Sequence, residues 1–471
     1  MKPLQQIQSL YRGILALFVV LASWQTAFAQ FTNGQAATFV LGQPNFTSNA
    51  AAATANRMSF GEGMVVDATN NKLYVVDRNN HRVLRFAFPV TGNQPNCEVV
   101  FGQTNTTNNL PNAGGGVGAV GLNAPTAVAV NPSTGDIFIS DQLNNRILRF
   151  AAAHSVPNGS HGPSAASVIG QPNFTSNAAG VSQNTLSTPH GIIITPGFFN
   201  MWIADYGNHR VVRIPNADIT VTQPNFDRCI GQTAWTNNTS GNGANQLNNP
   251  IGVYTDAAAT WLFIADIANN RVLRFATPPP VFNASATAVL GQTGFGLNAA
   301  GNGAAQMNVP RDVVVDAAGR LYVSDEFNNR VLVFNNAVSL GNGASADNVL
   351  GQSGFGVGGA GLNAVQFNAP RGLAMNGTSL FVSEQNNNRV LQFDPAIPYL
   401  YIGSITNNVV QRLTTGGAGF TNYVAGGGNV RGVHAEQSTG FLYWANDGAG
   451  AIGRSNLNGT GVNQSFITGL G

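Results

Sequence analysis

The sequence predicts an all-β fold, a six-bladed β-propeller. Three features predict it: a ten-residue phrase that recurs six times, alternating apolar and polar residues around each copy, and Gly/Asn-rich connections between copies. The phrase runs DRNNHRVLRF (77–86), DQLNNRILRF (141–150), DYGNHRVVRI (205–214), DIANNRVLRF (266–275), DEFNNRVLVF (325–334) and EQNNNRVLQF (384–393). Its copies start 64, 64, 61, 59 and 59 positions apart, and such regular spacing indicates a repeat architecture.

Each unit has the same order of four predicted strands, here called a to d. Strand a is a segment such as APTAVAVN (124–131), and strand b is an alternating run such as DIFISD (136–141). Strand c follows the recurring turn, as in RILRF (146–150), and strand d ends in Gly-Gln, as in SVIGQ (167–171). Period-two alternation rich in Val, Ile and Phe, broken by Gly, Asn and Pro, is typical of strands. Four short antiparallel strands repeated six times are the signature of a propeller.

The order of the strands predicts how the ring closes. The first d-type strand, at 37–43, precedes any strand a, whereas the last set, 369–393, has no strand d after it. We therefore expect 37–43 to complete the sixth blade, which removes the exposed edges of an open sheet. Cys97 and Cys229 then fall on the outer strands of blades 1 and 3, and we expect both to be buried and unpaired.

The repeated phrases resemble the NHL-repeat propellers. The resemblance rests on Pro-x-x-V-x-V-D, then L-Y-V-x-D, then x-x-N-x-R-V, repeated across residues 37–394. The units are longer than a typical blade of about 40–45 residues. The excess lies in the loops between strand d and the next strand a, which we call the d–a loops.

Residues 399–471 do not follow this register. The stretch FLYWAND (441–447) with IGRSNLNG (452–459) is similar to the YWTD-type propeller repeat, although Ala445-Asn446 stands where that repeat has Thr-Asp. Fewer than two blades cannot bury their faces alone. Either these blades pack on the first ring or 399–471 is part of a second propeller that is truncated here, and we favour the second interpretation.

The first 29 residues have the features of a signal peptide. Lys2 and Arg12 supply positive charge, residues 13–24 are apolar, and Ala27-Phe28-Ala29 forms a small-x-small cleavage site. The apolar run is shorter than the about twenty residues that span a bilayer. We expect cleavage near Ala29, secretion to the periplasm or the extracellular space, and no membrane span in the mature chain.

Composition narrows the class of partner. Only 9% of residues are charged and the net charge is +2, so a nucleic-acid partner, which needs a concentrated positive face, is not expected. With 43% hydrophobic residues the chain also lacks the composition of a disordered protein. We expect a monomer.

The acid, Asn and Arg of the recurring turn are predicted to be structural. A ligand ring is the alternative, but repetition in all six blades favours structure because a site usually breaks symmetry. We expect the acid to end strand b, the Asn to adopt the left-handed conformation, and the Arg to bridge to a carboxylate or carbonyl of a neighbouring blade. The residues are Asp77, Asn80, Arg82, Asp141, Asn144, Arg146, Asp205, Asn208, Arg210, Asp266, Asn269, Arg271, Asp325, Asn328, Arg330, Glu384, Asn387 and Arg389.

The six blades differ at one residue near the start of strand a, which follows Pro in five blades and Gly61 in blade 1. This position is expected at the mouth of the central channel. It holds Glu62, Thr126, His190, Ile251, Arg311 and Arg371 in blades 1 to 6. Because blades 5, 6 and 1 are contiguous, Arg311, Arg371 and Glu62 are predicted to converge. Two arginines could hold a carboxylate or sulfate by forked hydrogen bonds. The alternative is an inter-blade salt network with Glu62. The candidate ligand-binding residues are Glu62, His190, Arg311 and Arg371.

No catalytic constellation is recognisable, and none is predicted. Some NHL propellers are peptide-amidating lyases that bind zinc through several channel histidines, and only His190 matches such a position here. The sequence favours a secreted, non-enzymatic scaffold that binds a protein, peptide or glycan on the face of the d–a loops. Aromatic residues of these loops, Phe46, Phe174, Phe295 and Trp235, either contact that ligand or tuck against neighbouring blades. The alternative is a metal-dependent lyase or lactone hydrolase at the channel mouth. No cofactor is predicted, and calcium in the channel stays an open alternative without a supporting motif.

Overall fold

The computed structural model describes residues 31–216, 219–277 and 282–394, together with seven further strands between 399 and 468. These parts form two compact units, 31–394 and 395–471. The predicted signal peptide lies outside the described residues. Within the described parts, no helix is long and apolar enough to cross a membrane.

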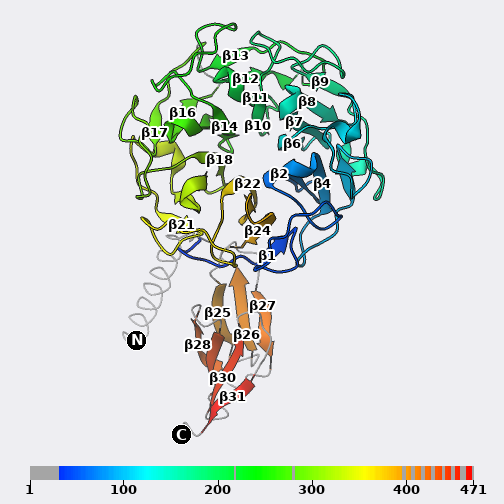
Figure 1. Ribbon diagram of the computed structural model, residues 1–471. Coiled ribbons are helices and arrows are strands. Elements are labelled where there is room, and N and C mark those ends of the chain that lie inside the picture. Colours follow the sequence, from blue (N-terminus) through cyan, green and yellow to red (C-terminus); the bar gives the residue numbers. More distant parts are fainter. Residues whose placement is uncertain are drawn as a thin grey trace, which may run out of the picture. The chain divides into compact units, whose positions relative to one another are not determined.

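The first unit is a six-bladed β-propeller (Figure 1), as predicted, and each blade is a four-stranded antiparallel sheet. The a strands surround the centre: β2 (Gly61–Asp67), β6 (Pro125–Asn131), β10 (Pro189–Ile194), β14 (Pro250–Thr255), β18 (Pro310–Val315) and β22 (Pro370–Asn376). The b strands follow: β3 (Lys72–Asp77), β7 (Asp136–Asp141), β11 (Met201–Asp205), β15 (Trp261–Asp266), β19 (Leu321–Asp325) and β23 (Ser379–Glu384). The c strands are β4 (Arg82–Ala87), β8 (Arg146–Phe150), β12 (Arg210–Ile214), β16 (Arg271–Ala276), β20 (Arg330–Phe334) and β24 (Arg389–Phe393).

Short outer strands complete the blades. They are β5 (Val99–Phe101), β9 (Ser167–Ile169), β13 (Arg228–Ile230), β17 (Ala288–Leu290), β21 (Asn348–Leu350) and, for blade 6, β1 (Phe39–Leu41). β1 pairs antiparallel with β24, placing Phe39, Val40 and Leu41 opposite Gln392, Leu391 and Val390. The predicted closure of the ring by the N-terminal strand is therefore confirmed.

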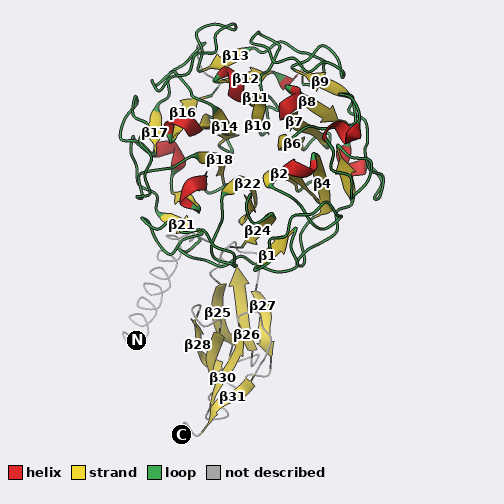
Figure 2. Ribbon diagram, in the orientation of Figure 1, coloured by secondary structure: helices red, strands yellow, loops and turns green. Residues whose placement is uncertain are grey.

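The recurring phrase forms the b–c turn. In blades 1 to 5 this turn is a short 3₁₀ helix: η1 (Arg78–Asn80), η3 (Gln142–Asn144), η5 (Tyr206–Asn208), η7 (Ile267–Asn269) and η8 (Glu326–Asn328). Figure 2 shows these helices as short coils around the ring. Three others, η2 (Pro111–Gly114), η4 (Ala153–Ser155) and η9 (Ala337–Ser339), lie in loops.

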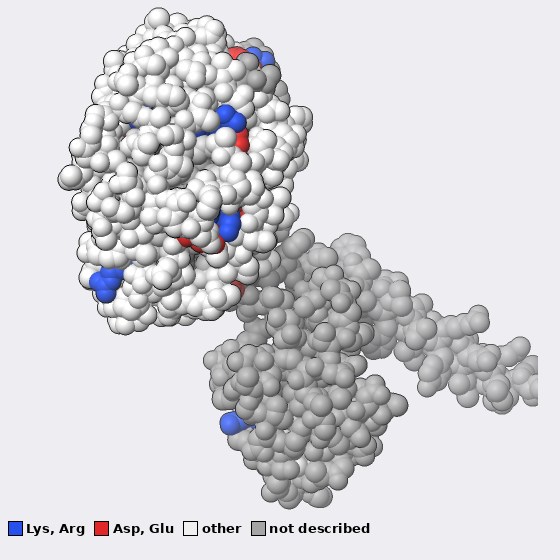
Figure 3. Space-filling model, turned by 90° about the vertical axis from the view of Figure 1, so that its right-hand side faces the viewer, with Lys and Arg blue, Asp and Glu red and all other residues white. Residues whose placement is uncertain are grey.

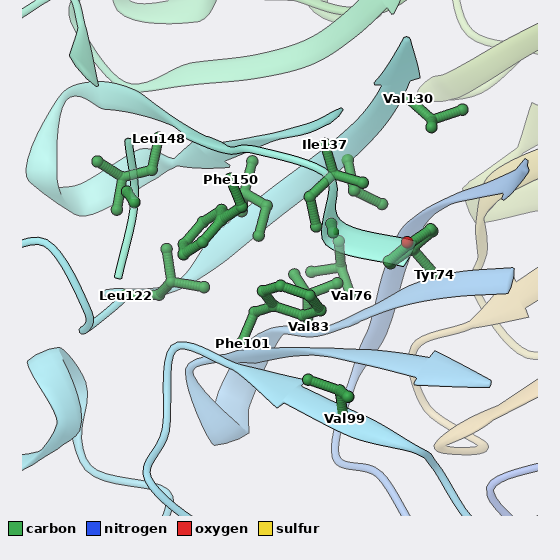
Figure 4. Packing of buried hydrophobic residues seen from close by; sticks show 14 of the residues in the cluster. Tyr74, Val76, Val83, Val99, Phe101, Leu122, Val130, Ile137, Leu148 and Phe150 are labelled. Atoms are coloured by element: carbon green, nitrogen blue, oxygen red, sulfur yellow. The ribbon is translucent and has the colours of Figure 1, made fainter. Parts of the chain in front are cut away.

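The core consists of apolar layers between adjacent blades. Successive residues of β3 alternate between two layers: Leu73 and Val75 pack toward blade 6, whereas Tyr74 and Val76 pack toward blade 2. Figure 4 shows the second layer, where Val76 and Phe101 approach Phe150 of blade 2. Because both faces of each inner strand are buried, these strands are apolar at nearly every position, and each fully buried side chain contributes about 1.5–3 kcal/mol.

The two cysteines differ from expectation in one respect. Cys229 lies in outer strand β13 and is buried, as predicted. Cys97 is only half-buried and precedes outer strand β5 by two residues, because its N–H bonds the loop carbonyl of Ala55 instead of the sheet. Both are free thiols.

The second unit contains two sheets. One has three strands, β25 (Tyr399–Ser404), β26 (Val409–Thr414) and β27 (Phe420–Ala425). The other has four, β28 (Val430–Glu436), β29 (Phe441–Asn446), β30 (Ala451–Asn456) and β31 (Asn463–Thr468), in the sequential order of a blade. Its register slips between Val430 and Val433, as blade 3 slips between Pro189 and Ile192. The pairing of this sheet is blade-like. That residues 399–471 belong to a second, YWTD-type propeller stays a prediction.

Candidate functional site

The recurring turn is a buried, fully bonded ion pair. In blade 1, Arg82 donates through Nε to Asp77 at 2.7 Å, and Asn80 donates to both oxygens of the same carboxylate at 3.0 and 2.8 Å. Both members of the Arg82–Asp77 pair have no exposed surface. The same pair recurs in the other five blades. Burial raises the pKa of Asp77, and the Arg82 guanidinium opposes that shift.

In blades 1, 2, 3 and 6 the arginine holds the d–a loops on both sides of its blade, whereas Arg271 and Arg330 of blades 4 and 5 bond the preceding loop. Arg82 donates to the carbonyl of Thr106 in the following loop and to those of Thr54 and Arg57 in the preceding one. The Gln of each Gly-Gln phrase adds a second anchor. Gln103, which is fully buried, donates to the carbonyls of His81 and Leu110. The prediction of a structural turn agrees with these contacts, although the carboxylate partner belongs to the same blade.

The turn Asn is not the left-handed residue, so that prediction was wrong. The next residue is, with φ 51° at His81, and Asn80 instead lies within η1. The left-handed residue carries a side-chain acceptor for the N–H that precedes the next strand a: His81 Nδ1 accepts from Ala124, and Asn145 Oδ1 from Thr188. His and Asn exchange at this position because both supply an acceptor and both tolerate positive φ. We call this contact the inter-blade clip.

The aromatic residues of the d–a loops pack inward. Phe174, Trp235, Phe46 and Phe295 each lie partly buried against the layer between two blades. Of the two expectations for these rings, the structure therefore favours packing against the blades.

The structure brings the four candidate residues together where blades 5, 6 and 1 meet, with His190 of blade 3 completing the group. Arg371 donates to both oxygens of Glu62 at 3.1 Å. His190 Nε2 lies 3.6 Å from Glu62 Oε1. The approach of blade 6 to blade 1 requires Gly372, because a Cβ there would lie 2.3 Å from the carbonyl oxygen of Glu62.

Two charged residues of this network were missed. Glu326 accepts from Arg371 at 2.8 Å and also pairs with Arg311. Arg78 lies 4.0 Å from Glu62 and donates to Gln142 at 2.6 Å. Both follow directly after the motif acid, a position that also breaks symmetry: it holds Arg78, Gln142, Tyr206, Ile267, Glu326 and Gln385. Comparing that position across blades would have found them.

The environment of the network is mostly buried. Phe60 stacks its ring 4.6 Å from the Arg371 guanidinium and 5.6 Å from that of Arg78. Burial, reinforced by Arg78, lowers the pKa of His190 well below its ordinary value, so its imidazole is neutral at neutral pH. The Nε of Arg371 is buried and has no hydrogen-bond partner among the described residues. Figure 3 shows how few charged side chains reach one side of the propeller surface.

The network closes one end of a central channel of about 300 Å³. Glu62, His190, Arg311 and Arg371 line that end. Apolar residues of the a strands line the middle, among them Met64, Val128, Ile192, Val253 and Leu373. Two further carboxyl residues line the channel. One is Asp67 at the end of β2, and the other is Asp312, which stands where the other blades have Gly63, Ala127, Gly191, Gly252 and Gly372. Burial raises the pKa of Asp312 to about 7.

The described residues contain no group of three His, Cys, Asp or Glu side chains that could hold a metal ion. The acids at the channel end are instead paired with guanidinium groups. These pairs correspond to the salt network that the sequence left open as the alternative to a ligand site.

Comparison with known proteins finds the NHL repeat in two stretches of the chain. The family model of the NHL repeat matches residues 62–86 and 307–334. NHL repeat-containing protein 3 of Mus musculus is 29% identical over 157 residues, which cover 32% of this chain and 40% of that protein. The match thus spans less than half of the curated relative.

Similar solved structures have low identity. A Bacteroides thetaiotaomicron protein of unknown function has a TM-score of 0.44 at 12% identity, covering 76% of this chain and 75% of its own. A gluconolactonase from Xanthomonas campestris has a TM-score of 0.42 at 13% identity, covering 76% and 98%. Virginiamycin B lyase from Staphylococcus aureus has a TM-score of 0.39 at 12% identity, covering 84% and 94%. Such likeness indicates nothing about activity.

Proposed function

Because the chain is an NHL-repeat β-propeller, we propose that it is a secreted, monomeric, non-enzymatic binding protein that recognises a protein, peptide or glycan on its loop face. The loop face comprises the six d–a loops, 43–60, 103–124, 171–188, 232–249, 292–309 and 352–369, and the b–c turns beside them. Both kinds of connection emerge on the same side of the ring because successive strands alternate in direction.

The observation that carries this proposal is the contrast between anchored loop ends and varied loop surfaces. Every d–a loop is tied to the ring by the buried arginines of the recurring turn, as Arg210 ties Ser182, Thr185 and Trp235 through their carbonyl oxygens. Between these anchors the loops differ in sequence, although 43–60 and 171–188 both begin QPNFTSNAA, and the second loop has 22 residues where the other five have 18. A rigid ring that carries variable loops is the usual arrangement of a recognition surface.

The chemistry of the loop face favours an uncharged contact. The six loops contain one charged residue, Arg57, and are otherwise rich in Asn, Thr, Ser and Gly. Exposed apolar side chains lie among them: Leu110, Leu297 and Val357 in the loops, and Leu143 and Phe327 in the turns. Amide and hydroxyl groups around scattered apolar side chains suit a neutral polar partner better than a highly charged one.

A partner search with a matched pair of variants tests the proposal. The mature chain is screened against a glycan array and a phage-displayed peptide library, and each ligand obtained is titrated. Phe327 on the loop face and Phe198 in the a–b turn of blade 3 on the opposite face are both 62% exposed. We expect Phe327→Ser to weaken binding at least tenfold and Phe198→Ser to leave it unchanged.

Two outcomes contradict the proposal. One is that neither screen yields a ligand that binds the mature chain. The other is that every ligand obtained loses affinity equally in both variants, or only with Phe198→Ser.

A further inference from the structure

The two ends of the central channel differ in exposure. At the end next to the b–c turns, Glu62, Thr126, His190, Ile251 and Arg371 are buried, and Arg311 keeps 17% of its side chain exposed. The exposed lining residues, Ala68, Thr69, Pro132 and Pro196, belong to the a–b turns of blades 1 to 3 at the opposite end. The channel is therefore a pocket that opens on the face opposite the loops and has the charged network as its floor.

The floor has more hydrogen-bond donors than acceptors. The Nε of Arg371 has no hydrogen-bond partner among the described residues, although only 8% of this side chain is exposed. Arg311 uses only Nε, in its bond to Glu326, and no hydrogen bond among the described residues involves its terminal nitrogens. The imidazole of His190 likewise makes no hydrogen bond within the described parts of the chain, and its nearest charged neighbour is Glu62 at 3.6 Å.

The acceptors at the floor are already engaged. Both oxygens of Glu62 receive Arg371, and Asp312 accepts the backbone N–H groups of Val313 and Leu373. A buried donor without a partner is costly, so the site is complementary to a ligand that brings oxygen acceptors. Two guanidinium groups side by side match the two oxygens of one carboxylate.

The charges around the pocket disfavour a ligand with more than one negative charge. Arg78, Arg311 and Arg371 face Glu62, Glu326 and Asp312, while His190 is neutral; Tyr254, whose pKa burial raises to about 12, is neutral as well. Asp67, the last residue of β2, also lines the pocket, so the formal sum is −1 with Asp312 ionised and zero with it protonated. A dianion such as phosphate would meet three carboxyl groups within the pocket itself, those of Glu62, Asp67 and Asp312.

The apolar walls of the pocket favour a ligand with an apolar body. Met64, Val128 and Ile192 line the stretch above the floor, and exposed Phe198 follows Pro196 by two residues at the opening. The volume of about 300 Å³ is roughly twice that of a cavity that binds benzene.

We propose that the channel is a second binding site, separate from the loop face, for a small monocarboxylate with a compact apolar body. The ligand enters between the a–b turns and places its carboxylate against Arg311 and Arg371. The same chemistry is offered by a free organic acid or by the C-terminal residue of a peptide with an apolar side chain. The site does not depend on the loop-face partner, so either proposal can fail alone.

Calorimetric titration of the mature chain with phenylacetate tests this site, and phenylacetamide is the neutral control. A second arm compares N-acetyl-Gly-Gly-Phe with its C-terminal amide, which separates a free acid from a chain terminus as the source. We expect the carboxylate form to bind at least tenfold tighter than the amide in at least one arm. Arg311→Leu should reduce that affinity at least tenfold, whereas Arg228→Ala, which removes a 40% exposed arginine of outer strand β13 that does not line the channel, should not change it.

The pH dependence gives an independent readout. Protonation of Asp312 removes a negative charge from the pocket, so phenylacetate should bind three- to tenfold tighter at pH 6 than at pH 8. In Asp312→Asn that difference should vanish, with the affinity at pH 8 rising to the value at pH 6. Thermal unfolding of each variant confirms that it is folded.

The proposal is overturned if neither carboxylate binds at millimolar concentration, if acid and amide bind equally, or if folded Arg311→Leu binds as the unchanged chain does. Phe327→Ser should leave phenylacetate binding intact. A loss there would place the ligand on the loop face instead.

Discussion

Buried arginine–carboxylate pairs occur in two regions of this propeller, and they differ in how completely they are bonded. In the recurring turn, Arg82 makes four hydrogen bonds, one to Asp77 and three to loop carbonyls. At the channel floor, Arg371 donates hydrogen bonds to Glu62 and Glu326, but its Nε has no hydrogen-bond partner among the described residues. The first arrangement recurs in six blades and the second occurs at one junction. Repetition with complete bonding therefore marks the scaffold, and broken symmetry with spare donors marks a site.

The largest expected effect comes from breaking a turn pair. Arg82→Ala should lower the free energy of unfolding by about 3–5 kcal/mol, because it leaves Asp77 as an uncompensated buried charge. Arg311→Ala should cost less than about 1 kcal/mol, since Glu326 keeps Arg371 as a partner and Arg311 is 17% exposed. Urea unfolding at pH 7 measures both. Equal losses would show that the two regions are alike.

A smaller effect concerns Asp312, whose folded pKa of about 7 exceeds the ordinary value of 3.8. The unfolded chain ionises this group first, so its contribution to stability is complete below about pH 4 and is lost as pH rises to about 7. Asp312→Asn should therefore raise stability at pH 8 by about 1–3 kcal/mol and change it little at pH 4. Thermal melts at both pH values test this, and equal shifts at the two would contradict it.

The smallest effect tests the inter-blade clip. His81→Ala should cost about 1 kcal/mol, because it removes the acceptor for the Ala124 N–H and places Ala at positive φ. His81→Asn should keep the stability, as Asn occupies this position in blades 2, 4, 5 and 6. Burial lowers the pKa of His81. Protonation in acid removes the Nδ1 acceptor of the clip and so destabilises the wild-type chain, whereas the Asn variant is unaffected. Denaturant unfolding at pH 7 and pH 5 distinguishes the three chains.

Much of the candidate site could be predicted by comparing equivalent positions of the six blades. Glu62, Arg311 and Arg371 were predicted to meet because their position in strand a faces the channel in every blade. Glu326 and Arg78 were missed because they belong to the b–c turns and not to strand a. They approach Arg371 only because these turns pack over the end of the channel. Asp312 was missed although the six strands a show it in sequence, with Gly in four blades and Ala in one at the same position; only the packing of the strands around the channel shows that this carboxyl group is buried there.

The sequence by itself determined the blade count, the closing strand 37–43 and the structural turn, because each follows from local periodicity repeated six times. Only the tertiary structure decided which side of the ring opens into the channel, which residue of the turn is left-handed, and which donors at the floor stay unpaired. Those properties depend on contacts between blades, made by residues that lie 43 to 309 positions apart in the chain.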